Sequence, residues 1–111
     1  MLEDGGRGIR FPVTVGIEDT NGFAIRYQGQ VHAYLNRCAH VALELDWNQG
    51  EFFDGTKQYL MCSTHGAIYW PENGRCAGGP CRGGSLRPIT VWERDGQVFW
   101  QPDEYVRPVR A

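Results

Sequence analysis

The sequence predicts an all-β fold of short antiparallel strands, folded as a single domain over residues 1–111. Gly (15) and Pro (6) fill 21 of the 111 positions, which is above average usage but short of the roughly 25–30% typical of low-complexity chains. Runs of β-branched and aromatic residues lie between these turn formers, and no internal repeat or heptad interrupts them. A chain of this length buries about 65% of its unfolded surface, which is enough for one core.

The first third of the chain predicts paired strands. The runs GIRFPVTV (8–15) and FAIRY (23–27) have the composition of strands. The overlapping run RYQGQVHAYL (26–35) is typical of two strands joined at Gln28-Gly29, since short turns of this kind connect alternating apolar runs. We therefore expect a hairpin here.

A second hairpin is predicted near the C-terminus, in ITVWERDGQVFWQ (89–101). Asp95-Gly96 lies at its tip, where a primed turn needs residues that tolerate positive φ. The following run QPDEYVRPVR (101–110) contains two prolines, which disfavour a helix. We expect this run to be an extended tail.

The segment 36–85 differs from both hairpins, because Gly and polar residues divide it every few positions. Its aliphatic runs are too short to build a large core of their own. HVALEL (40–45) is the one stretch that could form a helix, and it is too short to be stable alone.

Charge and composition exclude several classes of partner. The net charge of -2 and the pI near 5.9 provide no field that would attract nucleic acid or an anionic membrane. The opening MLEDGGRGIR has two acids and no apolar core, so it resembles neither a signal peptide nor a transit peptide. We expect a cytoplasmic protein, in which four cysteines serve as metal ligands or thiols rather than as a disulfide framework.

The chemistry of the chain is concentrated in two short Cys/His pairs. Cys38 and His40 are separated by one residue, and Cys62 and His65 by two. A single pair of this kind is more often a half-buried histidine beside a small hydrophobic cysteine than a ligand pair. Two pairs, each on a predicted loop tip and each followed by a short strand-like run, favour one shared metal centre. Tetrahedral zinc suits such ligands, but its knuckles space a pair by two to four residues.

The pattern C-x-H followed by C-x-x-H resembles the Rieske iron-sulfur family from about Ile9 to Trp100. Further matches are Gly66 after the second histidine, Tyr69, Gly74 and the GGPC run at 78–81. The resemblance implies a Rieske-like antiparallel β-sandwich or barrel. Its base would comprise about 9–35 and 86–101, and the inserted cluster-binding subdomain about 36–85.

The resemblance also implies one Rieske-type 2Fe-2S cluster. Cys38 and Cys62 would ligate one iron, and His40 and His65 the other. The glycines around Pro80 would form a third loop over the cluster, where small residues let the backbone approach closely.

The chain departs from the family in its spacer and in its other cysteines. The run DWNQGEFFDGT (46–56) is the expected insertion, a polar and aromatic turn or hairpin. The disulfide of high-potential relatives would fall at Leu43 and Thr64, so it is absent here. We expect Cys76 and Cys81 to be reduced thiols. The alternative is a zinc site that combines them with Cys62 and His65 and leaves the first Cys/His pair without a role.

Several other residues receive structural or tuning roles. His32 is expected to be a hydrogen-bonded, half-buried strand residue. The resemblance implies that the Tyr69 hydroxyl donates to a sulfur of the cluster, while Ala67 stands where high-potential relatives carry a serine donor. The tryptophans are expected to be core or half-buried strand residues, namely Trp47, Trp70, Trp92 and Trp100.

The resemblance implies a one-electron carrier between a reductase and an acceptor enzyme such as an oxygenase. An oxygenase would need a second iron held by two histidines and a carboxylate, and His32 alone remains after the cluster is built. The chain is therefore expected to be an electron-transfer protein and not an enzyme, with Val41 and Pro80 among its docking contacts. The alternative is a non-enzymatic accessory subunit or redox sensor of a larger oxidoreductase complex.

Overall fold

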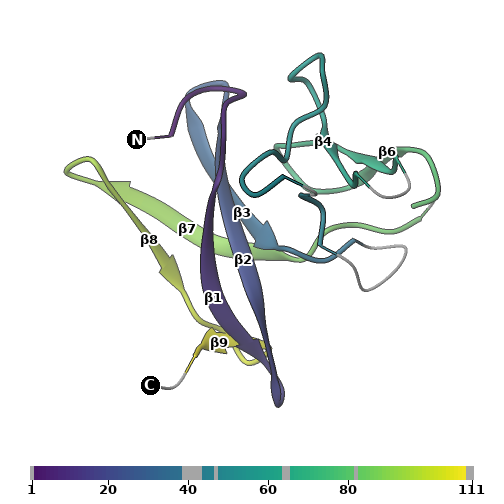
Figure 1. Ribbon diagram of the computed structural model, residues 1–111. Helices are drawn as coiled ribbons and strands as arrows, with labels where there is room; N and C mark the ends of the chain where they lie inside the picture. The colour runs from purple at the N-terminus through teal and green to yellow at the C-terminus, as the bar shows by residue number, and fades with distance from the viewer. Residues whose placement is uncertain (1, 39–43, 47, 64–65, 82, 110–111) are drawn as a thin grey trace.

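A computed structural model describes residues 2–38, 44–46, 48–63, 66–81 and 83–109, and these residues form two antiparallel sheets (Figure 1). Over the described residues the secondary structure consists of strands and turns, and no helix there is long and apolar enough to cross a membrane. The expected all-β fold is confirmed. The strands are β1 (Ile9–Val15), β2 (Glu18–Tyr27), β3 (Gln30–Leu35), β4 (Leu60–Met61), β5 (Ile68–Tyr69), β6 (Cys76–Gly78), β7 (Pro88–Arg94), β8 (Gln97–Gln101) and β9 (Val106–Pro108).

The larger sheet has six strands in the order β8-β7-β3-β2-β1-β9. Both predicted hairpins are part of it. In the β2–β3 hairpin, Gln28 and Gly29 have φ of 51° and 80°, and in the β7–β8 hairpin Asp95 and Gly96 have φ of 53° and 76°. Positive φ at both central residues is the signature of a primed turn, whose twist matches that of the strands. The turn chemistry therefore set the register of each hairpin.

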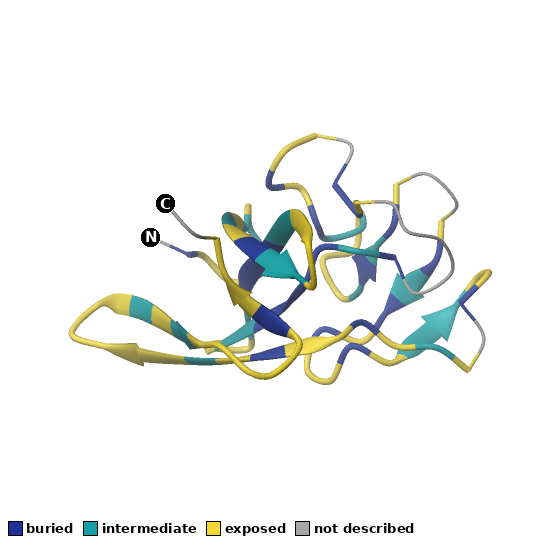
Figure 2. Ribbon diagram, turned by 90° about the horizontal axis from the view of Figure 1, so that it is seen from below, coloured by how far each residue is buried: buried dark blue, intermediate teal, exposed yellow. Residues whose placement is uncertain are grey.

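The six-stranded sheet curls, so that its two ends approach each other (Figures 1 and 2). The ring centroids of Phe11 on β1 and Trp100 on β8 lie 5.1 Å apart across the opening. A buried apolar cluster lines this concave face. Its buried members are Leu2, Val13, Ala24, Ala33, Leu35, Ile89 and Val106.

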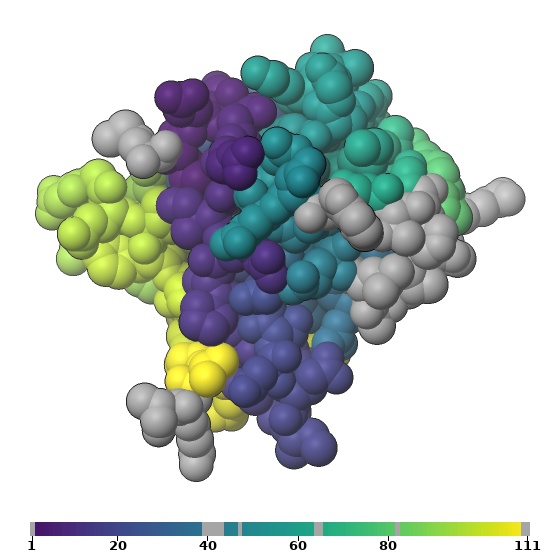
Figure 3. Space-filling view, viewed as in Figure 1, coloured from purple at the N-terminus to yellow at the C-terminus, as the bar shows by residue number. Residues whose placement is uncertain are grey.

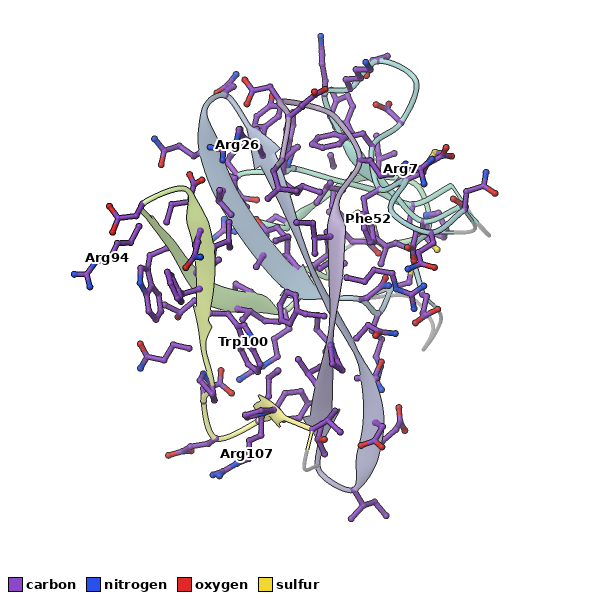
Figure 4. The ribbon with its side chains drawn as sticks, turned by 60° about the vertical axis from the view of Figure 1, so that its left-hand side comes forward. Arg7, Arg26, Phe52, Arg94, Trp100 and Arg107 are labelled. Carbon is purple, nitrogen blue, oxygen red and sulfur yellow. A yellow bond between two sulfur atoms is a disulfide. The ribbon has the colours of Figure 1, made fainter. Side chains whose placement is uncertain are left out.

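A second apolar cluster joins the large sheet to the three-stranded sheet β4-β5-β6. Phe23 of β2 stacks on Phe52 with ring centroids 3.9 Å apart and planes inclined by 10°. Figure 4 shows Phe52 directed into the interior. In the space-filling view the segment that contains β4 to β6 covers one end of the curled sheet (Figure 3). The expected insertion 46–56 therefore supplies a core side chain as well as a surface turn.

The sequence predicted an extended tail at the C-terminus. Part of this run instead forms a strand. Val106–Pro108 form β9, which pairs with β1 in antiparallel register, Val15 opposite Val106. Val106 is 1% exposed, so its burial against the concave face offsets the entropy of ordering the end of the chain. The expected division into a base and an inserted subdomain at residues 36 and 85 stays a prediction.

The expectation for the tryptophans is wrong for two of them. Trp70 and Trp92 are 40% and 45% exposed. Trp70 packs on Tyr59 with centroids 5.0 Å apart, and Trp92 stacks on Phe99 at 5.9 Å. These aromatic side chains cover each other on the surface, and Trp92 and Phe99 are register partners across the β7–β8 hairpin. Trp100 is half-buried as expected, and Trp47 lies outside the described residues.

Candidate metal centre

Two of the four candidate ligands lie in the described residues, and both are buried. Cys38 follows the end of β3 and is 3% exposed, and Cys62 follows β4 and is 0% exposed. Both belong to the apolar cluster that joins the two sheets. The packing of the two sheets on this shared cluster therefore buries two cysteines that are far apart in the sequence. A buried apolar setting removes water from any group that these sulfurs bind.

Tyr69 on β5 contacts this site through its hydroxyl. Its hydroxyl lies 3.2 Å from Cys38 Sγ, and its side chain is fully buried. The phenol donates more strongly than a thiol, and a sulfur that carries negative charge would accept it. The sequence-based expectation that this hydroxyl is directed at a sulfur of the site is in agreement with this contact.

Backbone hydrogen bonds form the turn that carries Cys62. The Cys62 N–H donates to the Ala67 carbonyl at 2.8 Å, and the Gly66 N–H donates back to the Cys62 carbonyl at 2.8 Å. Gly79 lies against this turn. A Cβ at Gly79, whose φ is +80°, would lie 2.9 Å from the Gly66 carbonyl oxygen. Only glycine permits both this φ and this close approach.

A buried polar pair supports the segment that leaves Cys38, and sequence reasoning missed it. The Asn36 side chain donates to Asp46 Oδ1 at 3.0 Å and accepts from the Leu45 N–H at 2.9 Å. The other carboxylate oxygen of Asp46 accepts from the Gly50 N–H at 2.9 Å. Asn36 and Asp46 are only 1% and 5% exposed. The sequence indicated this pair only by placing the polar residues Asn36 and Asp46 on either side of the first Cys/His pair.

Charged groups beside Cys38 neutralise one another. A hollow next to this cysteine is lined by Arg37 and Arg87. Arg37 forms an ion pair with Glu18, and Arg87 forms one with Asp103 at 3.3 Å. Two backbone N–H donors, at residues 106 and 105, lower the pKa of the Asp103 carboxyl, and the Arg87 charge adds to their effect. The Asp103 carboxylate thus stays ionised opposite the Arg87 guanidinium.

The other expected ligands, His40 and His65, lie outside the described residues, as do Val41 and most of HVALEL (40–45). Within the parts of the chain that the structure describes, no three side chains of His, Cys, Asp or Glu converge as metal ligands. The whole ligand set, cysteines and histidines alike, therefore stays a prediction.

The expectation that Cys76 and Cys81 are reduced is wrong. Their sulfurs are joined in a disulfide across five positions of the chain, with Cα atoms 5.6 Å apart. Their separation in the sequence permitted this pairing, but it did not distinguish a bond from two thiols. The zinc alternative fails for the same reason, because disulfide sulfurs are not available as thiolate ligands.

His32 is half-buried on β3, opposite Ile25 of β2. Burial lowers the pKa of its imidazole, and the nearby Glu72 carboxylate opposes this shift only partly. The neighbouring Tyr34 hydroxyl donates to the Pro71 carbonyl at 2.6 Å, and burial raises its pKa. The Tyr34 hydroxyl thus holds β3 to the segment after β5.

A protein-family model described as "Rieske [2Fe-2S] domain" matches residues 7–93. The matched range contains both Cys/His pairs, Tyr69 and the Cys76–Cys81 disulfide. No curated protein sequence is significantly similar to the chain.

The fold is similar to several solved structures. The ferredoxin of carbazole 1,9a-dioxygenase from Nocardioides aromaticivorans IC177 has a TM-score of 0.69 and 20% identity, over 92% of this chain and 89% of its own. A chain of the complex of reduced oxygenase and oxidized ferredoxin in carbazole 1,9a-dioxygenase has a TM-score of 0.68 and 23% identity, over 90% of this chain and 92% of its own.

Longer chains also match. One belongs to a complex of a carbazole-bound oxygenase variant with ferredoxin, and it has a TM-score of 0.69 and 21% identity over 89% of this chain. This chain spans 25% of that longer chain. At these identities the likeness concerns the fold.

Proposed function

The chain belongs to the Rieske [2Fe-2S] domain family, and on this premise we propose that it is a one-electron carrier. Membership of the family implies one Rieske-type 2Fe-2S cluster. When bound, such a cluster accepts and returns a single electron. The observation that carries the proposal is the pair of buried cysteines in one apolar cluster, with the Tyr69 hydroxyl 3.2 Å from Cys38 Sγ.

The donor set of the chain fits this group. We propose that Cys38 and Cys62 hold one iron and that His40 and His65 hold the other. Two thiolates and two imidazoles are the ligands of a Rieske centre. The burial of both sulfurs agrees with this assignment, since the metal stabilises a bound thiolate in place of hydration by water. Gly79 approaches the Cys62 turn so closely that a side chain at this position would not fit. The backbone alone can therefore pass beside the proposed cluster at this point.

Residues around the cluster would set its reduction potential. The Tyr69 hydroxyl lies 3.2 Å from Cys38 Sγ, and it would donate to this sulfur when the sulfur is a metal-bound thiolate. A hydrogen bond to a ligand sulfur stabilises the more negative, reduced state. Ala67 is buried in the same cluster, and its methyl side chain offers no donor. We propose that the lack of a hydroxyl at position 67 places the potential in the lower part of the Rieske range, which spans roughly -150 to +300 mV.

We propose that the chain exchanges electrons with a reductase and with an acceptor enzyme such as an oxygenase. Support comes from the structural neighbours, some of which are complexes of a ferredoxin with an oxygenase. The sequence contains three histidines. Two are proposed cluster ligands, so the chain lacks the two further histidines that a mononuclear oxygenase iron needs. This count supports the proposed electron-transfer role rather than an enzymatic one.

A reconstituted electron-transfer chain tests this function. A flavin reductase and an oxygenase from which the native ferredoxin has been removed are mixed with NADH, substrate and a substoichiometric amount of this protein. The carrier role predicts many turnovers per chain, because each molecule is reduced and reoxidised repeatedly. Reduction by the flavin reductase without any onward transfer to several oxygenases would contradict it.

The alternative function is an accessory subunit or redox sensor. It predicts a stoichiometric complex that survives gel filtration and changes affinity with the oxidation state of the cluster. The carrier predicts transient binding, because electron-transfer encounters bury small interfaces. Gel filtration of the oxidised and the reduced protein with the same acceptor separates these two functions.

A further inference from the structure

We infer that the Cys76–Cys81 disulfide is a thiol–disulfide exchange site for a dithiol reductant, and that its reduction releases the loop packed against the Cys62 turn. The inference rests on the proposed function where it concerns the cluster. The presence of the disulfide and its place in the fold do not depend on that function. A disulfide in the reducing compartment that the sequence predicts is commonly transient and redox-active.

The disulfide lies beside the candidate metal centre. Cys76 on β6 is the register partner of Tyr69 on β5, and the Tyr69 hydroxyl contacts Cys38 Sγ. Cys81 is 3% exposed and is a buried member of the cluster that contains Cys38 and Cys62. The two half-cystines therefore connect the small sheet to the same core that holds the candidate ligands.

The residues between the two half-cystines form the loop that contacts the Cys62 turn. Gly78 is the register partner of Ile68, and Gly79 approaches Gly66 closely enough that a Cβ would lie 2.9 Å from its carbonyl. Pro80, at the end of this loop, is exposed. The disulfide closes a ring around these residues, so it limits how far they can move away from the turn.

The two sulfurs differ in access to solvent. Cys76 is half-buried and lines an open hollow together with Arg75, Gly83, Gly84 and Ser85. Arg75 is exposed, and its charge would attract an incoming thiolate. Cys81 is buried, so an attacking sulfur reaches Cys76 first.

A thiolate of the dithiol attacks Cys76 Sγ, the bond between Cys76 and Cys81 breaks, and Cys81 leaves as a thiolate that takes a proton from water. The second thiol of the reductant loses its proton and attacks the reductant's first sulfur, which is bonded to Cys76 Sγ in the mixed disulfide. Cys76 is released and protonated, and the reductant leaves as a disulfide. Two electrons pass from the dithiol to the pair.

The reduced form would find hydrogen-bond acceptors already in place. Cys81 Sγ lies 3.2 Å from the Gly78 carbonyl oxygen and 3.5 Å from that of Ile68, and Cys76 Sγ lies 3.7 Å from the Gly78 carbonyl oxygen. Buried thiols can donate weakly to such oxygens. Opening the disulfide therefore leaves no buried thiol without an acceptor, and the ring around Gly79 is lost. Water and small chelators would then reach the Cys62 side of the site more easily.

The test uses the purified, cluster-loaded protein, with reduced thioredoxin as the dithiol probe. Maleimide labelling after denaturation and mass spectrometry count the thiols before and after treatment. The decay of the visible cluster absorption in the presence of an iron chelator measures access to the site. We expect two additional labelled cysteines after treatment and a decay rate at least several-fold higher.

The matched control is the double variant Cys76→Ser, Cys81→Ser. It should lose its cluster at the faster rate from the start, and reduced thioredoxin should leave that rate unchanged. A disulfide that resists reduced thioredoxin, or a reduced wild-type protein whose decay rate is unaltered, would overturn the inference. Protein that never shows visible absorption would instead refute the proposed function, while the thiol count would still report on the exchange reaction.

Discussion

At the scale of single residues, the Tyr69 hydroxyl lies next to a candidate ligand sulfur, 3.2 Å from Cys38 Sγ, and would donate to it as a thiolate. Tyr69→Phe removes this donor and keeps the ring. A charge-assisted hydrogen bond contributes about 1.5–3 kcal/mol, which corresponds to a midpoint potential lower by about 65–130 mV. Voltammetry measures the shift. The control is Tyr59→Phe, because Tyr59 packs on Trp70 away from this contact, and equal potentials in both variants would contradict the assignment.

Ala67 permits the opposite change. It is fully buried in the cluster with both cysteines, and Ala67→Ser adds one hydroxyl donor beside them. We expect a higher midpoint potential, by an amount comparable to the loss in Tyr69→Phe, because each donor to a sulfur stabilises the reduced state. The same voltammetric measurement applies. A lower potential with the cluster retained would show that the added hydroxyl is directed elsewhere.

Single residues were predictable where a short motif carries the chemistry. The resemblance assigned a hydroxyl role to Tyr69, and the contact with Cys38 agrees with it. The Cys76–Cys81 bond was not predictable, because spacing alone gives no connectivity. Asn36 and Asp46 were missed because their pairing depends on the fold, which buries both.

At the scale of elements, the Asn36–Asp46 pair holds the two ends of the first ligand loop together. Asn36→Ala removes the bonds to Asp46 and to the Leu45 N–H. Leaving these buried groups with fewer partners costs about 1–3 kcal/mol in the free energy of unfolding. Denaturant unfolding measures this loss.

The control for this change is Asn48→Ala. Asn48 is exposed and donates to Glu51 at 3.2 Å on the surface, so its loss should remain within about 0.5 kcal/mol. Equal losses for the two variants would show that the buried pair does not support the loop.

Strands were predictable where adjacent residues specify the turn between them, and not where the partner strand is distant in the sequence. The turns at Gln28-Gly29 and Asp95-Gly96 require positive φ, which glycine and its preceding polar residue accept, and both hairpins are present. The strand β9 was missed because its partner β1 lies at the other end of the chain. Its sequence, with two prolines nearby, carries no periodic signal of that distant pairing.

At the scale of the whole molecule, the two sheets are joined by the stack of Phe23 on Phe52. Phe52→Ala should lower the free energy of unfolding by about 3–5 kcal/mol, since it leaves a cavity in a fully buried position. Phe99→Ala is the control, because Phe99 is 39% exposed. Thermal unfolding distinguishes them, and similar losses would contradict the role of Phe52 in joining the sheets.

The burial of His32 makes stability depend on pH. Its pKa in the folded chain is lowered from 6.5, so below about pH 6.5 the unfolded chain binds a proton that the folded chain does not, and stability falls as the pH falls. His32→Gln should weaken this dependence. The free energy of unfolding at about pH 7.5 and about pH 5.5 gives the difference for each protein. An unchanged difference would show that other groups dominate this pH range.

The whole account depends on which cofactor the chain binds, and metal analysis tests this most directly. Protein purified anaerobically from an iron-replete host is assayed for iron, zinc and acid-labile sulfide, and its EPR spectrum is recorded before and after reduction. The account predicts about two irons and two sulfides per chain, with an EPR signal only in the reduced state. Stoichiometric zinc without labile sulfide would contradict it.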